Sequence, residues 1–176
     1  MNINKPMSTK HLGFPPVIGE NPRILILGTF PSPMSRMKNE YYGNPRNRFW
    51  NIIFDLFSDE SPCADYPVKT ELLLQNKIAL WDVIKTCEAD SALDSSIKNP
   101  VYNTDLPSLL ADNRTIELVL FNGGNAYSFY RKGIGEIEKK VLPSTSPANA
   151  RMSYAEKLET WKKLLLCGAE VGCDNN

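Results

Sequence analysis

Short apolar runs separated by helical patterns constrain the fold of this chain more than any other feature. Three of them are "RILILGTF" (23–30), "KIALWDVI" (77–84) and "TIELVLFNGG" (115–124), and "KKVLPSTSP" (139–147) is a shorter fourth. Runs that are apolar throughout are typical of strands buried on both faces of a parallel sheet. The sequence therefore predicts an α/β fold, a three-layer α/β/α sandwich with a central four-stranded, mainly parallel sheet. The helical patterns cover residues 45–57, 66–76, 104–112, 125–132 and 154–166.

The length of 176 residues fits one domain that spans 1–176, and we expect flexible ends at 1–13 and 168–176. No apolar run approaches the roughly 20 residues needed to cross a membrane. The first residues also lack the charged and then apolar pattern of a signal peptide. A cytoplasmic monomer without membrane contact is therefore expected.

The cysteine pattern argues against a metal centre. The chain has four cysteines, Cys63, Cys87, Cys167 and Cys173, and one histidine, His11. No C-x-x-C pair occurs, and the spacings fit neither a zinc site nor an iron–sulfur cluster. We expect reduced thiols and no metal site.

Charge is distributed unevenly along a chain whose formal net charge is zero. Residues 1–50 carry +5, residues 51–130 carry −7 and residues 131–176 carry +2. Basic ends and an acidic middle can fold into a molecule with one positive face. An incidental scatter of solvated charges would explain the same numbers equally well.

The loops that follow the predicted strands are where an open α/β sheet binds its ligands. Their sequences are "GTFPSPMSR", "KTCEADSALDSSI", "NGGNAYSFYRK" and "PSTSPANAR". Small hydroxyls, amides and arginines suit phosphates and base edges, whereas a metal or a Ser-His-Asp triad requires other residues. The G-x-G-x-x-G and G-x-x-x-x-G-K-[ST] phosphate loops are absent. A receiver-like signalling domain would need clustered strand-end carboxylates, and Asp82 stands alone.

The stretch "YYGNPRNRFW" (41–50) opens the first predicted helix in an unusual way. Asn44 is a suitable N-cap, and Pro45 fits the first helical position. Phe49 and Ile53 belong to an apolar stripe that would face a core. Capping does not explain the aromatic, amide and arginine side chains that crowd the same turn, so this turn is also a candidate for the mouth of a site.

These motifs together resemble one family. "LGTFPS", "YYGNPRNRFW", "ALWDVI" with "SALDSSI", "LFNGGNA" and "VLPSTSPANA" follow one another as in the hypoxanthine-DNA glycosylase branch of the uracil-DNA glycosylase superfamily. The resemblance covers about residues 14–161. It implies an α/β/α enzyme that flips a deaminated base out of double-stranded DNA and hydrolyses its N-glycosidic bond without a cofactor. The family usually has histidine where this chain has Asn44, so no role of that histidine is transferred.

The resemblance also implies roles around the base. The amide of Asn47 would position the attacking water, although a first-turn amide is its plainer interpretation. Tyr42 would stack on the flipped base, and core packing fits it equally well. Asn122 would read the Watson–Crick edge, unless it is a turn asparagine. The turn after the first strand would face the base with Gly28, Thr29 and Phe30.

The loop "PSTSPAN" (143–149) corresponds to the second catalytic loop of the superfamily. It is expected to contact DNA through Ser144, Thr145, Ser146 and Pro147. Arg46, Arg48 and Arg151 are further candidate phosphate contacts, although each also suits a solvated surface. No lysine lies in a motif that suggests a Schiff base, so a monofunctional glycosylase is expected. Uracil or mismatched thymine as substrate, and a non-catalytic DNA- or nucleotide-binding module, remain alternatives.

Overall fold

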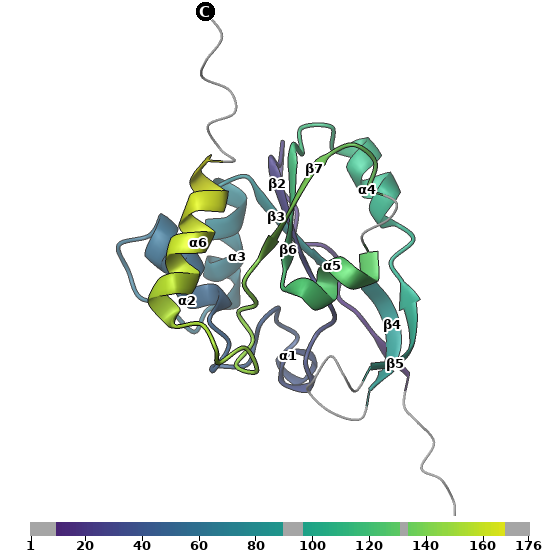
Figure 1. Cartoon of the computed structure of the whole chain (residues 1–176), viewed down its shortest axis with the longest axis horizontal. Coiled ribbons are helices and arrows are strands. Elements are labelled where there is room, and N and C mark those ends of the chain that lie inside the picture. The colour runs from purple at the N-terminus through teal and green to yellow at the C-terminus, as the bar shows by residue number, and fades with distance from the viewer. Residues whose placement is uncertain (1–9, 90–96, 131–133, 168–176) are drawn as a thin grey trace, which may run out of the picture.

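A four-stranded parallel sheet forms the centre of the fold (Figure 1). The computed structural model describes residues 10–89, 97–130 and 134–167. The strand order is β3-β2-β6-β7, with every neighbouring pair parallel, and this confirms the predicted sheet. The strands are β2 (Ile24–Gly28), β3 (Ile78–Asp82), β6 (Leu118–Asn122) and β7 (Glu138–Leu142).

Burial explains why these strands could be recognised from the sequence. All five residues of β2, of β3 and of β6 are buried, as expected for strands covered on both faces. The edge strand β7 is largely exposed and carries Lys139 and Lys140, which discourage pairing with another chain. At the other edge, Val17 exchanges two backbone hydrogen bonds with Leu80 of β3, at 2.9 and 2.8 Å.

Helices cover both faces of the sheet, which completes the three predicted layers. One layer contains α2, α3 and α6, and the other contains α4 and α5 (Figure 1). Trp161 is fully buried and meets Phe49 edge to face, with 5.8 Å between the ring centroids, so α6 and α2 pack closely. The bounds are α2 (Phe49–Phe57), α3 (Tyr66–Gln75), α4 (Leu106–Asp112), α5 (Gly124–Tyr130) and α6 (Tyr154–Cys167).

A second, antiparallel sheet was not predicted from the sequence. It contains β1 (Lys10–Leu12), β4 (Ile84–Ala89) and β5 (Ile97–Tyr102) in the order β1-β4-β5. Most residues of β5 are exposed and Pro100 lies within it, so neither an apolar run nor a regular alternation marks this strand. Of the expected flexible ends, 1–9 and 168–176 lie outside the described residues, and most of 10–13 forms β1.

The loop after β2 contains a short helix, α1 (Pro33–Lys38), where the sequence predicted only a loop. Its start carries ordinary signals, because Ser32 accepts a hydrogen bond from the N–H of Ser35 and Pro33 follows the cap. Asn39 ends it in the left-handed conformation, with φ of 54°. This helix lies at the end of the sheet where the parallel strands finish (Figure 1).

Two further expectations can be compared with the described residues. Cys63 and Cys87 are free thiols there, as the sequence predicted. Within the same residues, no helix combines the length and the apolar character that crossing a membrane requires.

Candidate active site

A cavity of about 340 Å³ lies at the carboxyl ends of the parallel strands. The turn after β2, the end of β6 and the loop after β7 meet there, as the strand-end argument anticipated. Every predicted base-binding residue lines this cavity, and so does Asn47. Of the predicted DNA contacts, Arg48 and Arg151 are outside the lining. The predicted residues that line it are Gly28, Thr29, Phe30, Tyr42, Arg46, Asn47, Asn122, Ser144, Thr145, Ser146 and Pro147.

The start of α2 differs from the prediction. Asn44 begins an isolated turn, in which its Oδ1 accepts from the N–H of Arg46 at 3.0 Å, and the helix starts only at Phe49. Asn44 and Pro45 are therefore not the N-cap and the first helical residue. Asn47 takes up the helical N–H instead, because its Oδ1 accepts from the N–H of Phe49 at 2.9 Å. This contact fixes the Asn47 amide at the cavity wall.

Tyr42 has a backbone conformation that bulky residues rarely adopt. Its φ is 53°, in the left-handed region, at a cost of roughly 1–3 kcal/mol. Its ring stacks on Phe49, with 4.0 Å between the centroids and 21° between the planes. Tyr42 therefore packs on the core through Phe49 and also lines the cavity, and its stacking on a base stays a prediction.

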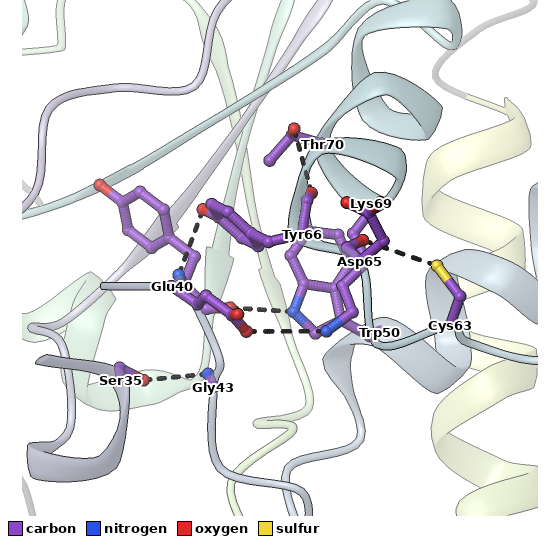
Figure 2. A network of polar contacts seen from close by, with 10 residues as sticks. Ser35, Glu40, Gly43, Trp50, Cys63, Asp65, Tyr66, Lys69 and Thr70 are labelled. Atoms are coloured by element: carbon purple, nitrogen blue, oxygen red, sulfur yellow. Dashed lines mark hydrogen bonds and ion pairs between the residues drawn. The ribbon is translucent and has the colours of Figure 1, made fainter. Parts of the chain in front are cut away.

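Two hydrogen bonds anchor this strained turn, one from Trp50 and one between Gly43 and Ser35 (Figure 2). Tyr41 is buried, and the indole N–H of Trp50 donates to its carbonyl oxygen at 2.9 Å. On the other side of Tyr42, the N–H of Gly43 donates to Oγ of the buried Ser35 at 3.1 Å. Both bonds hold the backbone around Tyr42, so the surrounding fold supports the positive φ.

Asn122, at the end of β6, is committed to bonds within the protein. Its amide nitrogen donates to the hydroxyl oxygen of Tyr42 at 3.0 Å and to Oγ1 of Thr145 at 2.8 Å. Its Oδ1 accepts from the backbone N–H of Thr145 at 3.0 Å. An amide nitrogen has two hydrogens, and both are used here. The geometry therefore makes Asn122 a link between Tyr42 and the loop after β7.

The loop after β7 is fixed at several points. The N–H of Arg48 donates to the carbonyl of Thr145 at 3.0 Å, and the amide nitrogen of Asn149 donates to the carbonyl of Ser144 at 3.1 Å. From α6, the ammonium of the buried Lys157 donates to the carbonyl of Asn149 at 2.7 Å. Burial, followed by the neighbouring Arg48, lowers the pKa of Lys157.

The four residues of this loop that were predicted to contact DNA differ in how far they are exposed to solvent. Thr145 is fully buried and bonded to Asn122, so it is not placed for the predicted phosphate contact. Ser144 and Ser146 are half-buried and Pro147 is exposed, and all three line the cavity. These three remain available for a ligand at its mouth.

The three predicted arginines are exposed but differ in position. Arg46 lines the cavity. The guanidinium carbon of Arg48 lies 5.8 Å from the ring centroid of Tyr154, so its side chain packs on α6. Arg151 lies in the turn before α6, outside the lining. Only Arg46 is brought to the cavity itself.

The family model "Uracil DNA glycosylase superfamily" matches residues 15–165. This match covers nearly all of the residues that form the sheet, its helices and the cavity. The chain belongs to the uracil-DNA glycosylase superfamily. The family resemblance predicted from the motifs is thereby confirmed.

Two curated proteins are similar to this chain over most of its length. A hypoxanthine DNA glycosylase from Methanosarcina barkeri is 39% identical over 151 residues, covering 84% of this chain and 94% of its own. A hypoxanthine DNA glycosylase from Methanosarcina acetivorans is 41% identical over 149 residues, covering 84% of this chain and 93% of its own.

A solved structure confirms the superfamily fold. The solution NMR structure of a proposed uracil DNA glycosylase from Methanosarcina acetivorans superposes with a TM-score of 0.77 at 36% identity. It covers 92% of this chain and 99% of that chain. The predicted fold class therefore agrees both with the strand order and with this superfamily member.

The cavity lining includes a carboxylate that the sequence argument passed over. Asp82, at the end of β3, lines the cavity and is only 3% exposed. Its position at a strand end was the available signal, but a single carboxylate was considered only as evidence against a signalling domain. Other lining residues outside the prediction are Pro31, Ser32, Ser35, Tyr41, Asn44 and Ala148.

The described residues contain no group of three or more histidine, cysteine, aspartate or glutamate side chains that could hold a metal ion. The cavity lining formed by these residues likewise contains no lysine. Its side chains are hydroxyls, amides, aromatic rings, one arginine and one carboxylate. Such a set can stack on a flat ring, bond its edges and hold a water molecule.

Proposed function

We propose that this superfamily member is a monofunctional DNA glycosylase that releases hypoxanthine from deoxyinosine in double-stranded DNA and leaves an abasic site. One observation carries the proposal: the separate sequence motifs meet around a single cavity of about 340 Å³. That volume suits one small ligand such as a flipped base. The two similar proteins named hypoxanthine DNA glycosylases support this choice of base.

Asn47 is the proposed water-positioning residue. Hydrolysis places the hydroxyl of water on C1′ of the sugar, and the bonding electrons and a proton go to the departing base. One lone pair of Asn47 Oδ1 accepts from the N–H of Phe49, and a carbonyl oxygen has a second lone pair that can accept from water. A fixed amide can thus hold the water where the oxocarbenium-like sugar develops, without acting as a base.

Tyr42 and the turn after β2 are the proposed base-binding wall. Tyr42 is backed by Phe49 on one face, so a flipped base can stack on its other face. Gly28, Thr29 and Phe30 line the cavity beside it and bring the backbone close to the base. Asn122 holds Tyr42 and Thr145 in this proposal, in place of the predicted reading of the base edge.

The proposed DNA contacts lie around the mouth of the cavity. Ser144 and Ser146 accept backbone hydrogen bonds, at 3.2 Å in both cases, and their hydroxyl hydrogens can still be donated to phosphate. Pro147 is exposed beside them and can fill part of the space that the flipped base leaves. Arg46 lines the cavity and is a proposed phosphate contact, and Arg48 and Arg151 are proposed contacts outside the lining.

A panel of duplexes tests this function. Each duplex carries deoxyinosine, deoxyuridine, deoxyxanthosine or a G·T mismatch, and strand breakage is measured after alkali. Hypoxanthine is expected to be released fastest, and strands should remain intact without alkali, because the lining contains no lysine for lyase chemistry. Preferential release of uracil or thymine would assign another base, and binding without release would indicate a non-catalytic module.

A further inference from the structure

Asp82 is a buried carboxylate in the wall of the cavity. It ends the edge strand β3 and pairs in register with Gly28 of β2. A Cβ atom at Gly28 would overlap Oδ1 of Asp82 and lie 3.0 Å from the hydroxyl oxygen of Tyr42. The absence of a side chain at Gly28 therefore lets the carboxylate lie across β2, close to the ring proposed to stack on the base.

The charge of Asp82 influences the surrounding phenols. Burial raises the pKa of Tyr41, and the negative charge of Asp82 raises it further. Burial also raises the pKa of Tyr66, the hydrogen bond from the N–H of Tyr41 lowers it, and the charges of Glu40 and Asp82 raise it by smaller amounts. The cavity wall thus contains the acceptor Asp82, and the nearby Tyr41 and Tyr66 stay neutral.

Asn122 is the other polar residue that ends a strand of the central sheet. Its amide nitrogen donates to Tyr42 and to Thr145, and its Oδ1 accepts from the N–H of Thr145, so these three bonds fix it within the protein. A carboxylate, in contrast, has two oxygens and about four acceptor positions. Asp82 can therefore accept a hydrogen from a base edge in addition to its contacts within the protein.

Deamination changes this edge. Adenine has an unprotonated N1 and cytosine an unprotonated N3, whereas hypoxanthine has N1–H and uracil has N3–H. A fixed carboxylate accepts from such an N–H and repels the lone pair of the unmodified ring. We propose that Asp82 accepts the ring N–H of the flipped base and so selects deaminated bases over adenine and cytosine. This inference rests on the proposed function and adds the residue that selects its substrate.

The selection acts on binding, because a carboxylate beside the base gives no help to a departing group that gains negative charge. The test compares duplexes carrying deoxyinosine or the 2′-deoxyriboside of unsubstituted purine, whose N1 has no hydrogen. Second-order rate constants of base release are measured for wild type and Asp82→Asn. The asparagine amide can donate to the unprotonated N1, so the preference for deoxyinosine should fall about tenfold or more. Asp112→Asn, at an exposed position at the end of α4, is the matched control and should keep the wild-type preference.

Thermal melts of both variants report folding, and equal losses on the two substrates would mean that Asp82 only supports the structure. A binding measurement keeps the inference testable if Asp82→Asn fails to fold or if no base is released. Wild type should bind free hypoxanthine about tenfold or more tightly than free purine. Equal binding of the two bases overturns selection by Asp82. Preferential binding without any release overturns the proposed glycosylase and leaves the selection standing.

Discussion

At the residue scale, one side-chain oxygen of Asn47 joins folding to the proposed chemistry. Asn47→Ala removes the acceptor of the Phe49 N–H, so the free energy of unfolding should fall by about 1 kcal/mol. Base release should fall by roughly 10²-fold or more, as expected when one positioned polar group is lost from a transition state. Single-turnover release from deoxyinosine duplex and denaturant unfolding measure the two effects.

Two variants separate these effects. Asn113→Ala removes an amide that bonds to the carbonyl of Leu109 at the end of α4, outside the cavity lining, and should leave base release unchanged. Asn47→Asp keeps an acceptor for the helix and for water, so partial activity with weaker DNA binding is expected. If Asn47→Ala releases the base at the wild-type rate, Asn47 has only the structural role of accepting from the N–H of Phe49.

Asn122 gives a second prediction at this scale. Asn122→Ala leaves the buried N–H and hydroxyl of Thr145 without their partner, so the free energy of unfolding should fall by about 1–3 kcal/mol. Base release should fall in the same variant, because Tyr42 loses its hydroxyl contact. Denaturant unfolding is the decisive measurement. A stable variant with strongly reduced release would return Asn122 to the role of reading the base.

At the scale of elements, the sequence predicted the structures whose residues are uniformly buried. β2, β3 and β6 are continuous apolar runs, and their order in the chain already indicated a parallel sheet. The antiparallel sheet was missed because backbone pairing, and not burial, defines β5. The start of α2 was misplaced because Asn44 and Pro45 fit a cap pattern, whereas in the fold they form a separate turn and Asn47 bonds the N–H of Phe49.

Lys157 connects α6 to the loop after β7, which lines the cavity. Lys157→Met keeps the length of the side chain but removes the donor to Asn149, so the loop should lose its fixed position. Binding to a duplex with an abasic-site analogue should weaken, and base release should fall roughly tenfold or more through misplacement. Lys163→Met, at an exposed position of the same helix, is the matched control. If both substitutions weaken DNA binding and base release equally, the cause is the lost positive charge and not the lost hydrogen bond to Asn149.

The start of α6 should respond to acid. Ser153 and Glu156 form a capping box, in which the N–H and hydroxyl of Ser153 donate to the carboxylate at 2.8 and 2.7 Å. These bonds lower the pKa of Glu156, so the carboxylate stabilises the fold above the ordinary glutamate pKa. That contribution should be lost as the pH falls below about 4, through the lowered pKa.

Unfolding of wild type and Glu156→Gln at several pH values measures this contribution. Wild type should be the more stable protein at neutral pH, and the difference should vanish in acid. A difference that is independent of pH would assign the stabilisation to packing, because a neutral glutamine does not titrate.

At the scale of the whole molecule, the site is assembled from segments far apart in the sequence. The motifs predicted which loops would meet, since parallel strands end at one edge of the sheet. They did not predict how the partners pair within the site. The engagement of Asn122 depends on Tyr42 and Thr145, and the position of Asp82 depends on the register between β3 and β2. Such side-chain pairings are set by tertiary packing, which local patterns do not encode.

Charge distribution gives the last prediction. The net charge of zero suggests weak attraction to DNA, whereas the charges of the terminal segments suggest a basic face. If that face binds DNA, the affinity should fall steeply with salt, because each neutralised phosphate releases a counterion.

Arg46→Gln and Arg151→Gln should each reduce the slope of log affinity against log salt by about 1. Arg114→Gln is the control, because this exposed residue precedes β6 and so lies toward the amino ends of the parallel strands, away from the cavity. Binding is measured by titration of a labelled duplex from low to moderate salt. An affinity that does not change with salt would mean that the charge asymmetry is incidental. Equal slope changes for all three variants would mean that neither Arg46 nor Arg151 makes a specific phosphate contact.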